Sequence, residues 1–224
     1  MKKIIISIVS LLLFSILIII INYIIVGKYQ SKISEGKPII QNDTIKKAIL
    51  VIDIQEGITG KLSLDDYFIL KSDQLINNIN SVIDSSVSNR ITVIYVKSEI
   101  SNFLINILNS SLEKGSFGSQ FDSRLKLVSD LIISKDKSDA FSNPLLDSIL
   151  IKNDINNLVF VGVDLVECVN STILAAANRK YRISIISDAV LTKSDSLKKV
   201  TLDKFKQDGY EIITINDYYK SLHK

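Results

Sequence analysis

The sequence predicts an α/β protein: a three-layer α/β/α domain around a doubly wound, mainly parallel six-stranded sheet, preceded by one transmembrane helix. Short runs of Ile, Leu and Val alternate with stretches whose apolar residues recur at helical spacing. The strand-like runs are apolar at consecutive positions, as is typical of strands buried on both faces of a sheet. We therefore expect a basic N-terminus over residues 1–3, a transmembrane helix over 4–26, a polar linker over 27–46 and one domain over 47–224.

The first element is an uncharged run over residues 4–26, composed mostly of Ile and Leu. As an α-helix it reaches roughly 34 Å, enough to cross the hydrocarbon core of a bilayer. A cleaved signal peptide has a shorter apolar region and a small-x-small cleavage site, whereas this run is followed by Gly27-Lys28-Tyr29-Gln30. We expect an uncleaved single-pass anchor. Lysines flank both ends, but a very short basic N-terminus usually stays inside, so we expect the domain outside the cytoplasm.

The remaining elements follow in order. Residues 27–46 are polar and contain Pro38, which is typical of a tether. Apolar runs predict strands at 48–54, 90–96, within 127–134, and at 157–163, 182–187 and 210–215. Helical spacing of apolar residues, the pair Asn143-Pro144 and an Ala-rich stretch predict helices at 71–86, 143–152, 169–180 and 194–207.

Composition narrows the functional classes. The net charge is only +3 and the basic residues are scattered without interleaved aromatics, so we expect no nucleic-acid partner. The single cysteine, Cys168, cannot form an intrachain disulfide.

Three chemically active residues lie at predicted strand ends: Asp53 after the first strand, Lys135 after the third and Cys168 after the fourth. Ligands of open α/β sheets bind at the carboxyl ends of strands, where these side chains can converge. Cys168 opens a helix whose positive end favours the reactive thiolate, a cation lowers a thiol pKa, and a carboxylate can act first as base and then as acid. Taken singly, Asp53 can cap a turn, Lys135 can be solvated like Lys137, and Cys168 can be a buried apolar residue. Together they favour function.

The motifs around these residues resemble those of the isochorismatase-like cysteine hydrolase superfamily over essentially all of residues 47–224. Residues 48–55 (AILVIDIQ) are similar to the family's first strand ending in Asp-x-Gln, and 135–141 (KDKSDAF) to its Lys-x-x-Tyr-Ser-Ala-Phe. Residues 161–169 (VGVDLVECV) are similar to its Gly-Val-x-Thr-x-x-Cys-Val, and Asp188-Ala189 to its later Asp-Ala. Residues 115–119 lie where members have a Gly-rich loop.

The resemblance implies a catalytic triad of Asp53 as proton acceptor and donor, Lys135 as the organising charge and Cys168 as nucleophile. It selects Lys135 over Lys137, because Lys135 lies six residues before Phe141. It also implies a cis peptide between Val163 and Asp164, which would aim the amides of Asp164 and Cys168 at an oxyanion.

For the substrate pocket the resemblance indicates four residues, which are Gln55, Phe117, Phe141 and Leu165. The chain departs from the family at Ser138-Asp139 and at Leu165, near the expected pocket, so the sequence does not select the substrate.

The function implied is a membrane-anchored cysteine hydrolase that cleaves a small amide or related C–N bond through a thioester, without a cofactor. A metal-dependent nicotinamidase is disfavoured, because the only histidine is His223 near the C-terminus. Two alternatives stay open: an isochorismate-type vinyl-ether hydrolase, and a catalytically silent membrane-tethered binding module. The expected partners are a small-molecule substrate and the membrane, with a homo-oligomer also possible within the family.

Overall fold

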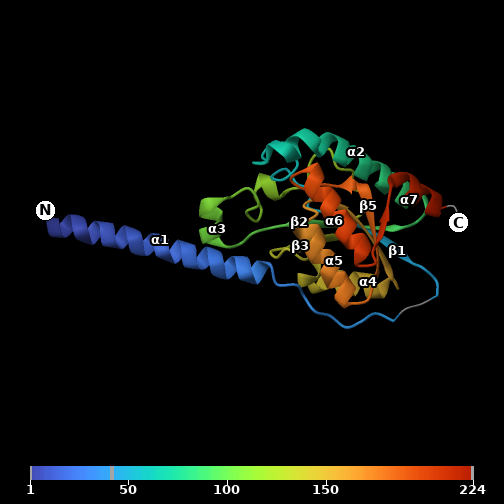
Figure 1. Cartoon of the computed structure of the whole chain (residues 1–224), viewed down its shortest axis with the longest axis horizontal. Helices are drawn as coiled ribbons and strands as arrows, with labels where there is room; N and C mark the ends of the chain where they lie inside the picture. The colour runs from blue at the N-terminus through green and yellow to red at the C-terminus, as the bar shows by residue number, and fades with distance from the viewer. Residues whose placement is uncertain (1, 41–42, 223–224) are drawn as a thin grey trace.

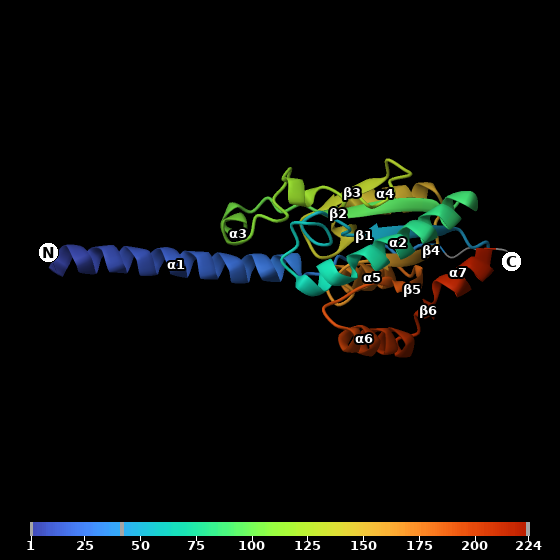
Figure 2. The ribbon, with the colours of Figure 1, turned by 90° about the horizontal axis from the view of Figure 1, so that it is seen from above.

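Strand β1 lies at the centre of a sheet in which every pair of neighbouring strands is parallel, in the order β3-β2-β1-β4-β5-β6 (Figures 1 and 2). The computed structural model describes residues 2–40 and 43–222. Its strands are β1 (Lys47–Ile52), β2 (Thr92–Ser98), β3 (Ile132–Lys135), β4 (Asn157–Gly162), β5 (Arg182–Val190) and β6 (Glu211–Ile213). Its α-helices are α1 (Lys2–Gln30), α2 (Asp66–Ser88), α3 (Phe103–Leu108), α4 (Pro144–Lys152), α5 (Cys168–Asn178), α6 (Asp195–Gln207) and α7 (Ile215–Leu222). The predicted six-stranded, doubly wound α/β sheet is confirmed, and it is parallel throughout.

Helices cover both faces of the sheet, as β1 illustrates. Ala48, Leu50 and Ile52 belong to one apolar cluster, together with side chains of α4, α5 and α6. Ile49 and Val51 belong to a second cluster, with side chains of α2 and α7. Successive side chains of a strand point to opposite faces, so a strand in the middle of three layers must be apolar at every position.

Several helices begin where a polar side chain caps them. Asp65 accepts the backbone N–H groups of Tyr67 and Phe68, so α2 begins earlier than residue 71, where the apolar spacing placed it. Asn143 and Ser194 cap α4 and α6 in the same way, close to the predicted boundaries. The sequence reasoning missed α3 and α7, which are short, with six and eight residues.

Helix α1 extends beyond the predicted residues 4–26 at both ends and projects away from the domain (Figure 1). Its side chains are mostly exposed, and it is long and apolar enough to cross a membrane.

The segment after α1, within the polar linker predicted over 27–46, lies against the domain. Ser34 donates its backbone N–H to Asp139 Oδ2 at 2.7 Å, and Ile39 donates its own to the Arg179 carbonyl at 2.8 Å. The buried Arg179 guanidinium in turn donates to the carbonyls of Ser34 and Glu35. The polar composition of this segment predicts a linker, and composition alone does not reveal backbone hydrogen bonds of this kind.

Candidate active site

The carboxyl edge of the sheet brings together four side chains from neighbouring strands. Asp53 directly follows β1, Ser98 ends β2, Lys135 ends β3, and Cys168 lies in the turn region after β4, as the first residue of α5. The chain reverses its winding between β1 and β4, and ligands of open α/β sheets bind at such a switch point. The three sequence-predicted residues therefore meet where the topology favours a site.

Lys135 is the centre of this cluster. Its Nζ donates to Asp53 Oδ2 at 2.9 Å, to Ser98 Oγ at 2.7 Å and to Cys168 Sγ at 3.4 Å. Ser98 Oγ lies 3.2 and 3.1 Å from the two carboxylate oxygens of Asp53. Lys137, the competing cation, instead places its Nζ 4.0 Å from the ring centroid of Tyr29 at the end of α1.

Burial controls the protonation of the cluster. Asp53 and Lys135 are almost fully buried, and Cys168 is half-buried. Burial opposes the charged form of Lys135, but the Asp53 carboxylate and Cys168 outweigh it, so the pKa of Lys135 is raised. Burial also raises the pKa of Cys168, Lys135 opposes this rise, and Asp53 adds to it. This direction is opposite to the low-pKa thiolate expected from the sequence, because burial and the Asp53 carboxylate together raise the pKa of Cys168 above its ordinary value.

The backbone around the cluster has unusual but fixed conformations. Asp53 adopts a left-handed φ of 55°, which aspartate tolerates better than most residues, and its N–H donates to the Val96 carbonyl at 2.9 Å. Gly162 ends β4 with φ of 126°, and a Cβ at this position would lie 2.1 Å from the carbonyl oxygen of Ile52. Only glycine permits β1 and β4 to approach this closely. The peptide bond between Val163 and Asp164 is cis.

Two backbone N–H groups around the turn before α5 differ from their neighbours in their hydrogen bonding. The N–H groups of Leu165, Glu167 and Val169 donate to backbone carbonyls, and that of Val166 donates to Asp164 Oδ1. Within residues 2–40 and 43–222, the N–H groups of Asp164 and Cys168 have no such partner. These are the two amides that the resemblance assigns to an oxyanion.

The four residues expected to line the substrate pocket do not form one surface. The Gln55 side chain donates to the carbonyls of Ser98 and Ser119 and accepts the Ser98 N–H, so its polar atoms are already used. Phe141 packs on Tyr181 and Arg179, and Leu165 is fully buried in the same cluster. Both are core residues, because their side chains are buried in the apolar cluster that contains side chains of α4 and α5. Phe117 alone of the four is largely exposed.

Ser98 is a member of the cluster that sequence reasoning missed. A single serine after an apolar run has no distinctive pattern, yet Ser98 obeys the rule that selected the other residues, because it ends a strand beside β1. Its hydroxyl links the Lys135 ammonium to the Asp53 carboxylate.

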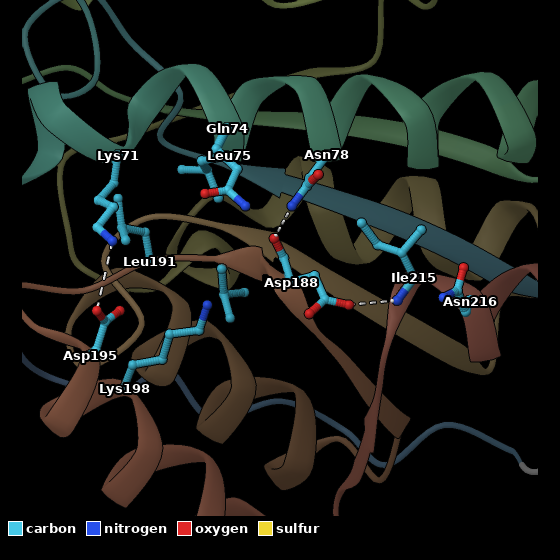
Figure 3. A pocket seen from close by; sticks show the side chains of 11 residues that line it. Lys71, Gln74, Leu75, Asn78, Asp188, Leu191, Asp195, Lys198, Ile215 and Asn216 are labelled. Carbon is cyan, nitrogen blue, oxygen red and sulfur yellow. Dashed lines mark hydrogen bonds and ion pairs between the residues drawn. The ribbon is translucent and has the colours of Figure 1, made fainter.

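Two hollows of substrate size lie near this edge. A cavity of about 300 Å³ is lined by Lys135 together with residues of the β2–β3 connection and of α4. A larger one, of about 490 Å³, lies between α2 and the ends of β5 (Figure 3). There Asn78 donates to the Asp188 carbonyl, and Lys71 lies 3.7 Å from Asp195. None of the four clustered residues lines the larger hollow.

A metal centre was not expected. Among residues 2–40 and 43–222, no group of three or more His, Cys, Asp or Glu side chains is placed to hold a metal ion. His223 lies outside the described residues.

The comparisons with known proteins agree with this fold. The family model described as the isochorismatase domain matches residues 47–217. The ureidoacrylate amidohydrolase RutB of Acinetobacter baylyi is 29% identical, over 56% of this chain, and the match spans 62% of that relative's length.

Solved structures extend the comparison. An N-carbamoylsarcosine amidase from Thermoplasma acidophilum has a TM-score of 0.66 and 27% identity, with 76% of this chain and 97% of that chain covered. An isochorismatase-like hydrolase from Alkaliphilus metalliredigens has a TM-score of 0.69 and 22% identity, with 79% and 98% covered. The chain therefore belongs to the isochorismatase domain family, and its relatives support a hydrolase.

Proposed function

We propose that this protein is a membrane-anchored cysteine hydrolase that cleaves the C–N bond of a small amide with Asp53, Lys135 and Cys168. The observation that supports the proposal most directly is the position of Lys135 Nζ, 2.9 Å from Asp53 Oδ2 and 3.4 Å from Cys168 Sγ in a buried cluster. A base, a cation and a nucleophile within contact distance are the components that covalent acyl transfer requires.

In the first half of the reaction, Cys168 Sγ attacks the amide carbonyl while its proton passes to the Asp53 carboxylate. The backbone N–H groups of Asp164 and Cys168, which have no other acceptor in the described part of the chain, stabilise the oxyanion that develops. As the C–N bond breaks, Asp53 returns the proton to the departing nitrogen. The products of this half are a thioester on Cys168 and free ammonia or amine.

In the second half, Asp53 takes a proton from a water molecule that attacks the thioester carbonyl. The C–S bond breaks, the carboxylic acid leaves, and the proton returns to Cys168. Lys135 keeps its charge throughout, because its raised pKa favours the ammonium form, and it steadies the carboxylate and the sulfur in turn.

The relatives favour a C–N bond over a vinyl ether. Ureidoacrylate amidohydrolase and N-carbamoylsarcosine amidase are both named for the cleavage of such bonds. We extend to this chain their chemical class, a small carbonyl compound bonded to nitrogen.

The test is turnover and trapping with the full-length protein in detergent. A panel of primary amides and N-carbamoyl amines is screened for ammonia release, and the acid-quenched enzyme is weighed for an acyl adduct. We expect turnover and a hydroxylamine-sensitive adduct on wild type, neither on Cys168→Ala, and both on the matched control Lys137→Met. Turnover that survives Cys168→Ala would refute the thioester route and favour vinyl-ether hydrolysis. Ligand binding without turnover on wild type would favour the silent binding module.

The membrane part of the proposal is based on α1. Its apolar stretch exceeds the thickness of a bilayer core, and its side chains are exposed rather than buried in the domain. We assign residues 1–3 to the inner side, 4–26 to the span and 47–224 to a hydrolase domain outside the cytoplasm. Protease added to intact cells should degrade the domain; complete protection in cells, with degradation after lysis, would reverse the orientation.

A further inference from the structure

The connection between β2 and β3 carries an unusual apolar surface. It contains α3, where the side chains of Phe103, Ile107 and Leu108 are between 57% and 74% exposed, and Phe117, which is 63% exposed. We call these four side chains the α3 surface. Phe103 and Ile107 are four residues apart and share one face of α3, and an exposed apolar face of this kind marks an interaction surface.

The position of α3 identifies what covers this surface. Helices α1 and α3 contact each other, and both views show α3 beside the C-terminal third of α1 (Figures 1 and 2). On this part of α1, Ile19, Asn22 and Val26 are half-buried, whereas most of their neighbours are exposed. Their spacing of three and four residues places them on one helical face, which is therefore the face that the domain covers.

This contact fixes the depth of α3 relative to the apolar run. Val26 is the last residue of that run, and Ile19 lies roughly 10 Å further in along the helix axis. A segment that packs beside residues 19–26 of a membrane-spanning helix lies at the bilayer boundary. Lys28 and Lys32 follow the apolar run closely and are exposed, so they can meet anionic headgroups.

The same elements connect to the catalytic edge. Ser98 is the last residue before the connection. The carbonyl of Ser119, two residues after Phe117, accepts a hydrogen bond from the Gln55 side chain, which also accepts the Ser98 N–H. On the other side, the Ser138 N–H donates to the Gln30 carbonyl at 3.0 Å, so the loop after Lys135 contacts the end of α1. The catalytic edge therefore lies between two elements at the membrane-proximal end of the domain.

We propose that the α3 surface inserts into the membrane interface beside α1, and that the site takes amide substrates that partition into the bilayer. The inference rests on the proposed anchoring and amide hydrolysis. The occupant of the α3 surface is lipid, because the surface continues a helix that is itself apolar and uncovered on most sides.

Tryptophan fluorescence tests the insertion, because the chain contains no tryptophan. Single-tryptophan variants of the full chain, Phe103→Trp and Ile107→Trp, are reconstituted into vesicles of phosphatidylcholine with or without brominated acyl chains. Leu12→Trp reports on α1. Ile151→Trp is the matched control, since it is an exposed apolar residue on α4 near the Lys46–Asp154 pair at the amino edge of the sheet.

We expect brominated lipid to quench the tryptophans on α1 and α3 and to leave the control unquenched. Quenching on α1 without quenching on α3 would overturn the inference while leaving the anchor intact. A blue-shifted but unquenched α3 tryptophan would also overturn it, because protein, such as a second copy, would then cover the surface. No quenching on α1 would overturn both the anchor and the inference.

A second measurement tests the substrate class. In the reconstituted enzyme, kcat/KM should rise with acyl chain length along a series of primary amides. The rise should shrink in the variant Phe103→Ser/Ile107→Ser/Leu108→Ser and persist in the control Ile151→Ser/Val200→Ser. Turnover without chain-length dependence would refute the substrate class alone. If no amide is cleaved, the proposed reaction is refuted together with the substrate class, and the quenching experiment still decides insertion independently.

Discussion

The raised pKa of Cys168 predicts slow alkylation of this thiol, whereas an activated thiol with a lowered pKa would be alkylated fast. We change Asp53→Asn and Lys135→Met and follow alkylation of this sole cysteine. Lys135 Nζ lies 3.4 Å from Sγ. At an effective dielectric of about 20, unit charges at this distance interact by roughly 5 kcal/mol, or about three to four pKa units. Removing the ammonium should therefore raise the thiol pKa further, whereas removing the carboxylate should lower it.

The magnitude for wild type follows from burial. Burial raises the pKa of Cys168 to about 12. Since a free thiol has a pKa of about 8.5, the thiolate fraction at pH 8 falls on the order of a thousandfold. Iodoacetamide should thus alkylate the folded chain about that much more slowly than the chain in denaturant.

The assay is intact-mass spectrometry of the full chain in detergent over a pH series. We expect the logarithm of the rate to keep rising with pH through pH 10, which separates a raised pKa from poor access. Asp53→Asn should react faster, Lys135→Met more slowly, and Lys137→Met like wild type. A plateau below pH 8, or a slower reaction of Asp53→Asn, would refute the reasoning.

Three further outcomes are expected. Asp53→Asn leaves the buried Lys135 ammonium unpaired and should reduce the free energy of unfolding by about 3–5 kcal/mol, and adding Lys135→Met should restore part of this loss. Denaturant titration followed by circular dichroism measures both effects, and full additivity of the two substitutions would contradict the pairing. Gly162→Ala places a methyl group against the Ile52 carbonyl and should cost about 3 kcal/mol in the same titration. Arg179→Ala should free the segment after α1 and speed its cleavage by trypsin, whereas the exposed Arg182→Ala should not.

The sequence predicted the sheet because its strands are apolar at consecutive positions. Lys47–Ile52 and Asn157–Gly162 are buried on both faces, and only a central parallel strand requires that pattern. Helix α3 escaped prediction because six residues are too few to show a period. Helix α7 escaped because it has only eight residues, half of which are Asn, Asp, Lys or Ser.

The meeting of three side chains at one edge was predictable from the topology. Asp53, Lys135 and Cys168 end or follow strands, and the parallel sheet brings strand ends together. The lining of the substrate pocket could not be predicted in the same way. The positions of Phe141 and Leu165 in or beside the motifs do not show which way their side chains point. The direction of the Cys168 pKa shift also could not be predicted. The sequence shows the start of a helix, which lowers a thiol pKa, but it does not show the burial that raises it.

The contacts of Ser34 and Arg179 attach the connection after α1 to the domain, so that it does not act as a flexible linker. In the proposed anchored state the domain keeps one height and one orientation above the lipid. Its encounters with substrate are then counted per area of membrane rather than per volume of solution. Adding empty vesicles dilutes the substrate within the membrane and should slow such an enzyme even when the total substrate concentration is constant. An enzyme on a flexible linker would also encounter substrate in the surrounding water.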